Sequence, residues 1–239
     1  MATIVLVPGA CLGGWAWARV TPLLEQAGHD VRPLTLTGLG PADRCADGAA
    51  IDLSTHVADV VAALERDDLR DVVLVGHSFS GLAISGAAAR VPERIARLVH
   101  LDATLPVDGV SAFAAAGPEF EQAIVAAAQA GGDPARVPWF DDATLDEYYP
   151  GNEISAADRA WVRAAAAGHP LATMREALTP AEPREPLPRT YVTCARRLFP
   201  GPIGDDTHGW DHVTLDAGHW PMFTRPAETA AVIDAETAR

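Results

Sequence analysis

Six short apolar runs, separated by segments with helical periodicity, constrain the fold of this chain more than any other feature. Such runs, when they alternate with helices, are typical of a mostly parallel sheet with helices on both faces. The sequence therefore predicts the α/β class, with about six strands. We expect these strands at Thr3 to Val7, Val31 to Leu36, Asp71 to Gly76, Arg97 to Leu101, Thr190 to Cys194 and His212 to Leu215.

The helical segments between the strands are predicted from their period and their ends. Ser54 can cap a helix whose apolar residues then recur at helical spacing. A second helix follows Val20 and stops at Gly28, and it accommodates Pro22 only if that residue lies in the first turn.

The alternation breaks between Leu105 and Arg189, where no convincing strand occurs and several helical fragments do. Ser155 followed by Asp158 forms a capping-box pattern ahead of Trp161. We expect residues 106–188 to form a helical cap inserted into a sheet domain made of residues 1–105 and 189–239. A proline-rich run near the end of this stretch would be its return linker, because Pro cannot continue a helix or a central strand.

Composition and charge exclude several classes of protein. The formal net charge of -14 would repel nucleic acid. No apolar run is long enough to span a bilayer, and no signal peptide is recognisable, so we expect a soluble, cytoplasmic protein with no membrane partner. The chain has no Lys, which excludes Schiff-base chemistry on lysine. Its three cysteines are too few and too scattered for a disulfide framework or a zinc ligand set.

The strongest local motif is Gly76-His77-Ser78-Phe79-Ser80-Gly81, which lies between a predicted strand and a helix of small residues. A sharp strand-to-helix turn of this kind holds its central Ser at a strained, exposed apex. The motif therefore indicates that Ser78 is a nucleophile. Ser80 stands where a second Gly is expected, so the match is imperfect at that position; a glycine-rich turn with a capping Ser is the alternative.

A serine hydroxyl needs a base to take its proton, and that base must itself be oriented by a third group. His219 is the best candidate among the histidines, because it follows the last predicted strand and comes after Ser78 in the chain. His77 is expected to face away from the nucleophile in a structural role. The remaining histidines have no motif around them, and packing or surface roles are expected for each.

Acyl transfer also requires donors for the developing oxyanion. The backbone N–H of Phe79 is one candidate, and the loop after the first strand supplies a second, for which we select Ala10. The glycines of that loop lack the G-x-G-x-x-G spacing of a dinucleotide-binding turn.

Several of these segments together resemble one branch of a known superfamily. The run Val5 to Ala10 with Gly14 to Trp17, the segment Leu36 to Gly40, the turn around Ser78, and Leu101-Asp102-Ala103 are similar to methylesterases and hydroxynitrile lyases of the α/β-hydrolase superfamily, especially bacterial ones. The resemblance is close over residues 3–110 and looser over 189–235. It implies an α/β-hydrolase fold, a Ser-His-acid triad, small esters or related carbonyl compounds as substrates, and neither a metal nor an organic cofactor.

The acid of the triad departs from the commonest arrangement. Many hydrolases of this fold carry it after the penultimate strand, but the corresponding segment, Cys194 to Pro200, contains no carboxylate. Asp102 ends the strand that follows the nucleophile strand and would lie at the carboxyl edge of the sheet, where catalytic groups gather. We select Asp102, while Asp205 and Asp206 in a later loop remain alternatives.

The leading functional prediction is hydrolysis of a small ester through an acyl-enzyme. A lyase reaction on a hydroxynitrile or another C–C bond, and a non-catalytic binding protein on the same scaffold, remain open. The substrate would lie between the sheet edge and the cap, where aromatic residues could line an apolar pocket. Candidates for these contacts are Trp139, Phe140, Tyr148, Tyr149, Trp161 and Trp220. No oligomeric state follows from these residues.

Overall fold

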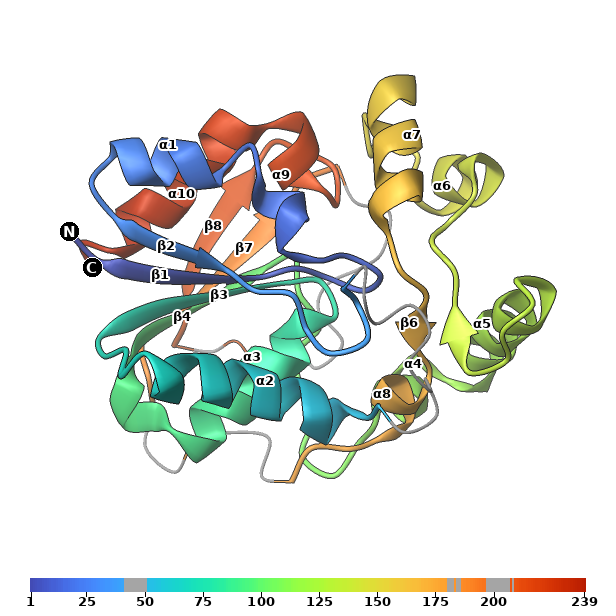
Figure 1. Ribbon diagram of the computed structural model, residues 1–239, viewed down its shortest axis with the longest axis horizontal. Helices are drawn as coiled ribbons and strands as arrows, with labels where there is room; N and C mark the ends of the chain where they lie inside the picture. The colour runs from blue at the N-terminus through green and yellow to red at the C-terminus, as the bar shows by residue number, and fades with distance from the viewer. Residues whose placement is uncertain (41–50, 180–182, 184–185, 197–206, 208) are drawn as a thin grey trace.

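In the computed structural model, six strands form one sheet in the order β2-β1-β3-β4-β7-β8, and every neighbouring pair is parallel (Figure 1). The structure describes residues 1–40, 51–179, 183, 186–196, 207 and 209–239. Each predicted strand is confirmed, with ends shifted by at most a few residues. The strands are β1 (Thr3–Val7), β2 (Asp30–Pro33), β3 (Val72–His77), β4 (Ile95–Leu101), β7 (Arg189–Cys194) and β8 (Asp211–Leu215).

Alternate residues of β1 pack into two different cores, as the two-residue period of a strand requires. Ile4 and Leu6 belong to one cluster, and Val5 and Val7 belong to another. Figure 1 shows the two helical layers that cover these faces. One contains η1 (Gly14–Trp17), α1 (Thr21–Gln26), α9 (Pro221–Thr224) and α10 (Pro226–Glu236); the other contains α2 (Leu53–Arg66) and α3 (Ser80–Arg90). The predicted α/β architecture is confirmed.

The ends of the first two helices follow elementary rules, with one correction. Pro22 lies in the first turn of α1, and Gly28 ends that region at a φ of 93°. The N-cap of α2 is Asp52, whose carboxylate accepts the Thr55 N–H at 2.8 Å. The prediction that Ser54 caps this helix was therefore wrong: Ser54 lies inside the first turn and donates its backbone N–H to Glu176 at 2.6 Å. Asp and Ser are both good caps, and the extended backbone at Asp52 decides between them.

The segment between β4 and β7 is mainly helical and lies beyond the carboxyl edge of the sheet (Figure 1). The capping pattern at Ser155 is confirmed, because its hydroxyl accepts the Asp158 N–H at 3.1 Å. The expectation of no strand here was wrong, since two antiparallel two-residue strands occur. After the short η4 (Pro92–Arg94) and β4, the elements are α4 (Ala112–Ala116), α5 (Pro118–Ala130), β5 (Arg136–Val137), α6 (Asp142–Tyr148), α7 (Ala156–Ala165), β6 (His169–Pro170) and α8 (Ala172–Arg175). The division at residues 106 and 188 stays a prediction.

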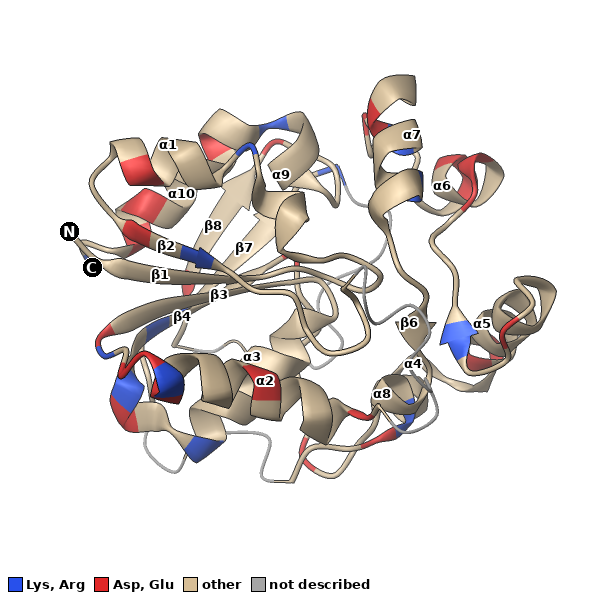
Figure 2. Ribbon diagram, in the orientation of Figure 1, with Lys and Arg blue, Asp and Glu red and all other residues tan. Residues whose placement is uncertain are grey.

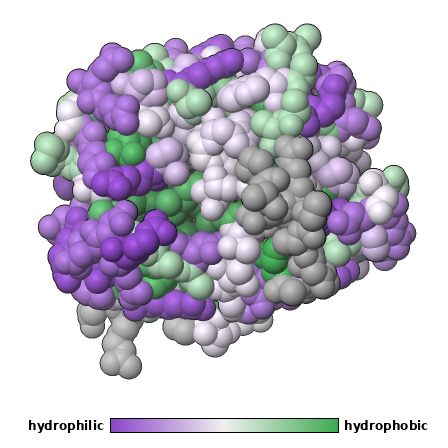
Figure 3. All heavy atoms as spheres, viewed as in Figure 1, coloured by the Kyte–Doolittle hydropathy of each residue, from purple (hydrophilic) through white to green (hydrophobic). Residues whose placement is uncertain are grey.

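Charged residues are spread over the outer helices, the loops and the strands β2 and β5, and acidic and basic ones are interspersed on the helices (Figure 2). The face in Figure 3 is correspondingly mixed, with hydrophilic residues at its rims and apolar residues between them. Within the described ranges, no helix has the length and apolar character needed to cross a membrane.

Candidate active site

Ser78 follows β3 directly and lies at the carboxyl edge of the sheet in a strained conformation. Its φ is 54°, which a residue with a Cβ rarely adopts. The turn needs small residues beside it. A Cβ on Gly81 would lie 2.2 Å from the Thr104 carbonyl oxygen, and one on Gly76 would lie 2.8 Å from Ile84. These close approaches explain why glycines flank the serine at this turn.

Ser80 occupies the position where the motif leads one to expect a second glycine. Its side chain is buried, and its hydroxyl donates a hydrogen bond to the Pro8 carbonyl oxygen in the loop after β1. A buried hydroxyl with a partner incurs little desolvation cost. Ser80, which replaces the expected glycine, therefore links the turn around Ser78 to the glycine-rich loop by a hydrogen bond.

Ser78, His219 and Asp102 form a continuous hydrogen-bonded chain. The distance from Ser78 Oγ to His219 Nε2 is 2.9 Å, and that from His219 Nδ1 to Asp102 Oδ2 is 2.6 Å. Because a carboxylate only accepts, His219 carries its proton on Nδ1 and leaves Nε2 free to accept from the Ser78 hydroxyl. This is the tautomer that a general base for Ser78 requires.

Asp102 comes immediately after β4, and its own backbone has a φ of 45°. The side chain is 2% exposed, and its second carboxylate oxygen accepts the backbone N–H of Cys194 at 3.2 Å. The N–H groups of Cys194 and His219 offset part of the cost of burying this carboxylate. The alternatives, Asp205 and Asp206, lie outside the described residues.

His77 supports the loop that carries His219. Its Nε2 donates to the His219 carbonyl oxygen at 2.7 Å, and the two rings lie 4.9 Å apart. Burial, and after it the charge that His219 carries when protonated, lowers the pKa of His77 to about 3. His77 is thus a neutral donor that holds the loop of His219 through the carbonyl oxygen of that residue.

The amides of Phe79 and Ala10 come from two chain segments beside Ser78. Phe79 precedes α3, so its N–H lies at the positive end of that helix. The loop that carries Ala10 packs on Ser78, since a Cβ on the adjacent Gly9 would lie 2.9 Å from Ser78 Cβ. Within the described part of the chain, neither amide donates to a protein acceptor. Both are therefore available to an external oxyanion.

Aromatic rings cover His219 on one side. Tyr149 stacks on the imidazole, with ring centroids 5.4 Å apart and planes at 24°, and it also contacts Trp220 at 4.6 Å. Trp139 contacts Trp220 at 5.3 Å, and Phe140 contacts Tyr149 at 5.5 Å. Burial raises the pKa of Tyr149 well above its usual value, so its hydroxyl stays protonated.

The other two predicted substrate contacts lie elsewhere. Trp161 belongs to a second aromatic group, with Trp15 at 5.1 Å and Phe223 at 5.5 Å. Tyr148 is 46% exposed on α6. The structure thus brings four of the six candidates into one group beside His219 and leaves Tyr148 and Trp161 outside it; the four are Trp139, Phe140, Tyr149 and Trp220.

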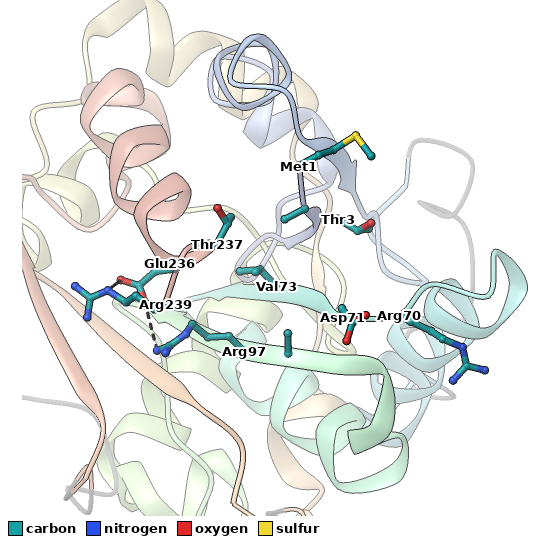
Figure 4. A pocket seen from close by; sticks show the side chains of 11 residues that line it. Met1, Thr3, Arg70, Asp71, Val73, Arg97, Glu236, Thr237 and Arg239 are labelled. Carbon is teal, nitrogen blue, oxygen red and sulfur yellow. Dashed lines mark ion pairs between the residues drawn. The ribbon is translucent and has the colours of Figure 1, made fainter.

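A cleft at the opposite, amino-terminal edge of the sheet does not carry this chemistry (Figure 4). Its lining residues, all within the described ranges, include no Ser, Cys or His. Arg97 and Arg239 both lie 3.4 Å from the buried Glu236 carboxylate, at the end of α10. This cluster fastens the last helix to the sheet.

The described residues also include no group of three or more His, Cys, Asp or Glu side chains that could hold a metal ion. The arrangement at the carboxyl edge suits nucleophilic catalysis by serine.

Comparison with known proteins agrees with this geometry. The sequence profile of the alpha/beta hydrolase family matches residues 4–232. The chain is 33% identical to a carbendazim hydrolyzing esterase from Nocardioides sp. (strain SG-4G), over 96% of this chain and 97% of that one. It is 39% identical to polyneuridine aldehyde esterase from Rauvolfia serpentina, but over only 43% of this chain and 39% of that one.

Solved structures share the fold. An extracellular alpha/beta-hydrolase from a Paenibacillus species superposes with a TM-score of 0.82 and 22% identity, over 98% of each chain. A methylesterase from Arabidopsis gives a TM-score of 0.76 and 21% identity, over 100% of this chain and 99% of that one.

Proposed function

Because the chain belongs to the alpha/beta hydrolase family, we propose that it is a serine esterase that cleaves small carboxylic esters through an acyl-enzyme on Ser78. One observation carries the proposal: the 2.9 Å and 2.6 Å contacts that join Ser78, His219 and the buried Asp102. The relatives named above are esterases, one of them similar along nearly its whole length.

In the acylation step, Ser78 Oγ attacks the ester carbonyl carbon as His219 Nε2 takes the hydroxyl proton. Asp102 stabilises the imidazolium that forms. The Phe79 and Ala10 amides donate to the oxyanion of the tetrahedral intermediate. The intermediate collapses when His219 gives its proton to the leaving alkoxide, which departs as the alcohol and leaves the acyl group on Ser78.

Deacylation repeats these steps with water as the nucleophile. His219 takes a proton from the water molecule as it attacks the acyl carbonyl, and it returns the proton to Ser78 Oγ as the acid is released. Every proton in the cycle passes through one imidazole nitrogen, Nε2. No cofactor or metal is needed for this sequence.

The aromatic group beside His219 supports a preference for esters with an apolar or aromatic portion. Tyr149, Trp220 and Trp139 lie in successive ring contacts leading away from the imidazole. Flat apolar surfaces of this kind favour flat apolar substrate groups through burial and ring stacking. The acyl or the alcohol portion of the ester would occupy this side of the site.

Turnover of p-nitrophenyl, methyl and lactone esters by purified protein tests the proposal. Ser78→Ala should lower kcat by at least ~10³ without unfolding the chain, because triad members act as a unit. Ser85→Ala is the matched control, since Ser85 is a buried serine on α3 whose hydroxyl pairs with His100. Unchanged turnover in Ser78→Ala would refute the proposal. Cyanide release from a hydroxynitrile, with no ester turnover, would favour a lyase.

A further inference from the structure

The loop that carries Ala10 holds an unfavourable backbone conformation at its next residue. Cys11 has a φ of 67°, and the turn is closed by the Leu12 N–H on the Gly9 carbonyl oxygen at 3.2 Å. A residue with a Cβ is strained at the third position of such a turn, where Gly or Asn is usual. Rotation of the Ala10–Cys11 peptide would relieve this strain, so other contacts must hold the turn.

Those contacts come from the segment between β4 and β7. The Cys11 carbonyl oxygen accepts the Ala167 N–H at 3.0 Å, and the Cys11 thiol donates to the Val137 carbonyl oxygen at 3.6 Å. The Cys11 N–H, which belongs to the strained peptide itself, donates to His169 Nδ1 at 3.3 Å. Of these three partners, His169 alone contributes a side chain. It binds the Cys11 N–H, which would point away from His169 if the Ala10–Cys11 peptide rotated.

His169 also contacts the second oxyanion segment. Its ring packs edge-to-face on Phe79, with centroids 4.7 Å apart and planes at 74°. Its other nitrogen, Nε2, pairs with the Thr173 hydroxyl at 3.0 Å, and that hydroxyl donates to the Pro170 carbonyl oxygen at 2.7 Å. Because the Thr173 proton is used in this way, Nε2 carries the hydrogen and Nδ1 is the acceptor.

The surroundings keep His169 in this neutral form. The side chain is 1% exposed, with the His56 ring 5.8 Å away. Arg136 is buried nearby and donates to the carbonyl oxygens of Gly38 and Gly168, each at 2.8 Å. Burial first, and then the charge that His56 carries when protonated and the charge of Arg136, hold the pKa of His169 well below its usual value. A protonated ring would lose the lone pair that Cys11 uses.

We propose that His169 is a positioning residue that aligns the oxyanion hole: its Nδ1 fixes the Ala10–Cys11 peptide, which directly follows the peptide that carries the Ala10 N–H, and its ring edge fixes the Phe79 side chain. The inference rests on the proposed function, since it concerns the amides assigned to the oxyanion. His169 touches no reacting atom; it acts through the two segments that carry Ala10 and Phe79. We therefore expect His169 to stabilise the transition state, and so to affect kcat, rather than to strengthen substrate binding.

Two substitutions separate the two ends of the imidazole. His169→Asn can place an amide oxygen where Nδ1 stands and keep the acceptor for the Cys11 N–H. His169→Gln can place an amide nitrogen near Nε2 and keep the Thr173 contact, but it lacks the acceptor. With p-nitrophenyl acetate, we expect His169→Gln to lower kcat about 10- to 100-fold with KM nearly unchanged, somewhat less than deletion of an oxyanion donor. We expect His169→Asn to stay within about threefold of wild type.

Binding of an alkyl boronic acid supplies a readout that loss of packing alone does not move. The boronate forms a tetrahedral adduct with Ser78 that resembles the transition state. Its Kd should rise in His169→Gln by the same factor as kcat falls, while Kd for the product acid stays constant. His100→Gln is the matched control, because His100 is equally buried, is exchanged in the same way and pairs with Ser85 on α3.

Three results would overturn the proposal: wild-type kcat and boronate affinity in His169→Gln, equal losses in His169→Asn and His169→Gln, or an equal loss in His100→Gln. If His169→Gln fails to fold, Thr173→Val takes its place. That change removes the hydroxyl that fixes the tautomer of His169, so kcat should fall about 3- to 10-fold. An unchanged kcat in Thr173→Val would contradict the proposal. Boronate affinity needs no turnover, so a wild-type protein that binds boronate but cleaves no ester would refute the proposed function alone.

Discussion

Replacing Asp102 with Asn changes the charge and the hydrogen-bonding capacity of one buried side chain while leaving its size unchanged. The carboxylate accepts two N–H groups, from His219 Nδ1 at 2.6 Å and from the Cys194 amide at 3.2 Å. An Asn side chain offers one acceptor oxygen and an NH₂ group that can only donate. Its oxygen can satisfy only one of the two N–H groups, and its NH₂ must face the other.

The effect of Asn on His219 depends on which of the two N–H groups, that of Cys194 or that of His219, can change its position. The Cys194 N–H belongs to β7 and is fixed, so the Asn oxygen should turn to it and the NH₂ should face His219 Nδ1. His219 must then carry its proton on Nε2, where it can no longer accept from Ser78. We expect kcat to fall by about 10² to 10⁴, which is about 2.7 to 5.4 kcal/mol of transition-state stabilisation.

The assay is steady-state hydrolysis of p-nitrophenyl butyrate, with a urea unfolding curve for each variant. Asp216→Asn is the matched control, because Asp216 lies three residues before His219 but pairs with Arg196 at 2.7 Å on the surface. That control should keep wild-type kcat. Near-normal turnover in Asp102→Asn, together with collapse in Asp205→Asn or Asp206→Asn, would refute the reasoning and move the acid to the later loop.

The other predictions concern the base, the aromatic group and the response to acid. His219→Ala should lower kcat about as far as loss of Ser78 and should slow phosphonate labelling; labelling at the wild-type rate would mean that another group is the base. Trp139→Ala should alter the ratio of kcat/KM for aryl and acetyl esters more than Trp161→Ala does, because only Trp139 adjoins the rings over His219; equal effects would contradict this. Burial lowers the pKa of His77 and His100 to about 3, below the usual 6.5, so the unfolded chain binds more protons in that range and the free energy of unfolding falls as pH falls. Urea midpoints at about pH 7 and about pH 5 should therefore differ less in His100→Gln than in wild type.

Features that depend on local sequence were predictable. The strand β3 and the turn at Ser78 come from a β-branched run followed by small residues, and both occur as expected. The helix start at Ser155 was likewise confirmed, since capping is a contact over three residues. The fold class and the esterase class followed from these elements and from the resemblance that they carry.

Features that depend on contacts between distant segments of the chain could not be predicted from the sequence. Nothing near His77 in the sequence indicates that its ring holds the His219 carbonyl, because that contact joins residues 142 positions apart. Tyr148 and Tyr149 are neighbours with similar surroundings in sequence, and only the end of α6 decides that Tyr149 turns toward His219. His169 had no motif around it for the same reason: its partners are Cys11 and Phe79, far away in the chain.

Active-site titration tests the central claim most directly. A p-nitrophenyl alkylphosphonate is added in substoichiometric portions, residual ester hydrolysis is measured after each addition, and the labelled peptide is identified by mass spectrometry. The account predicts that hydrolysis falls linearly to zero at one label per chain and that the label is on Ser78 Oγ. Hydrolysis that persists when Ser78 is fully labelled, or complete loss with the label on another residue, would contradict it.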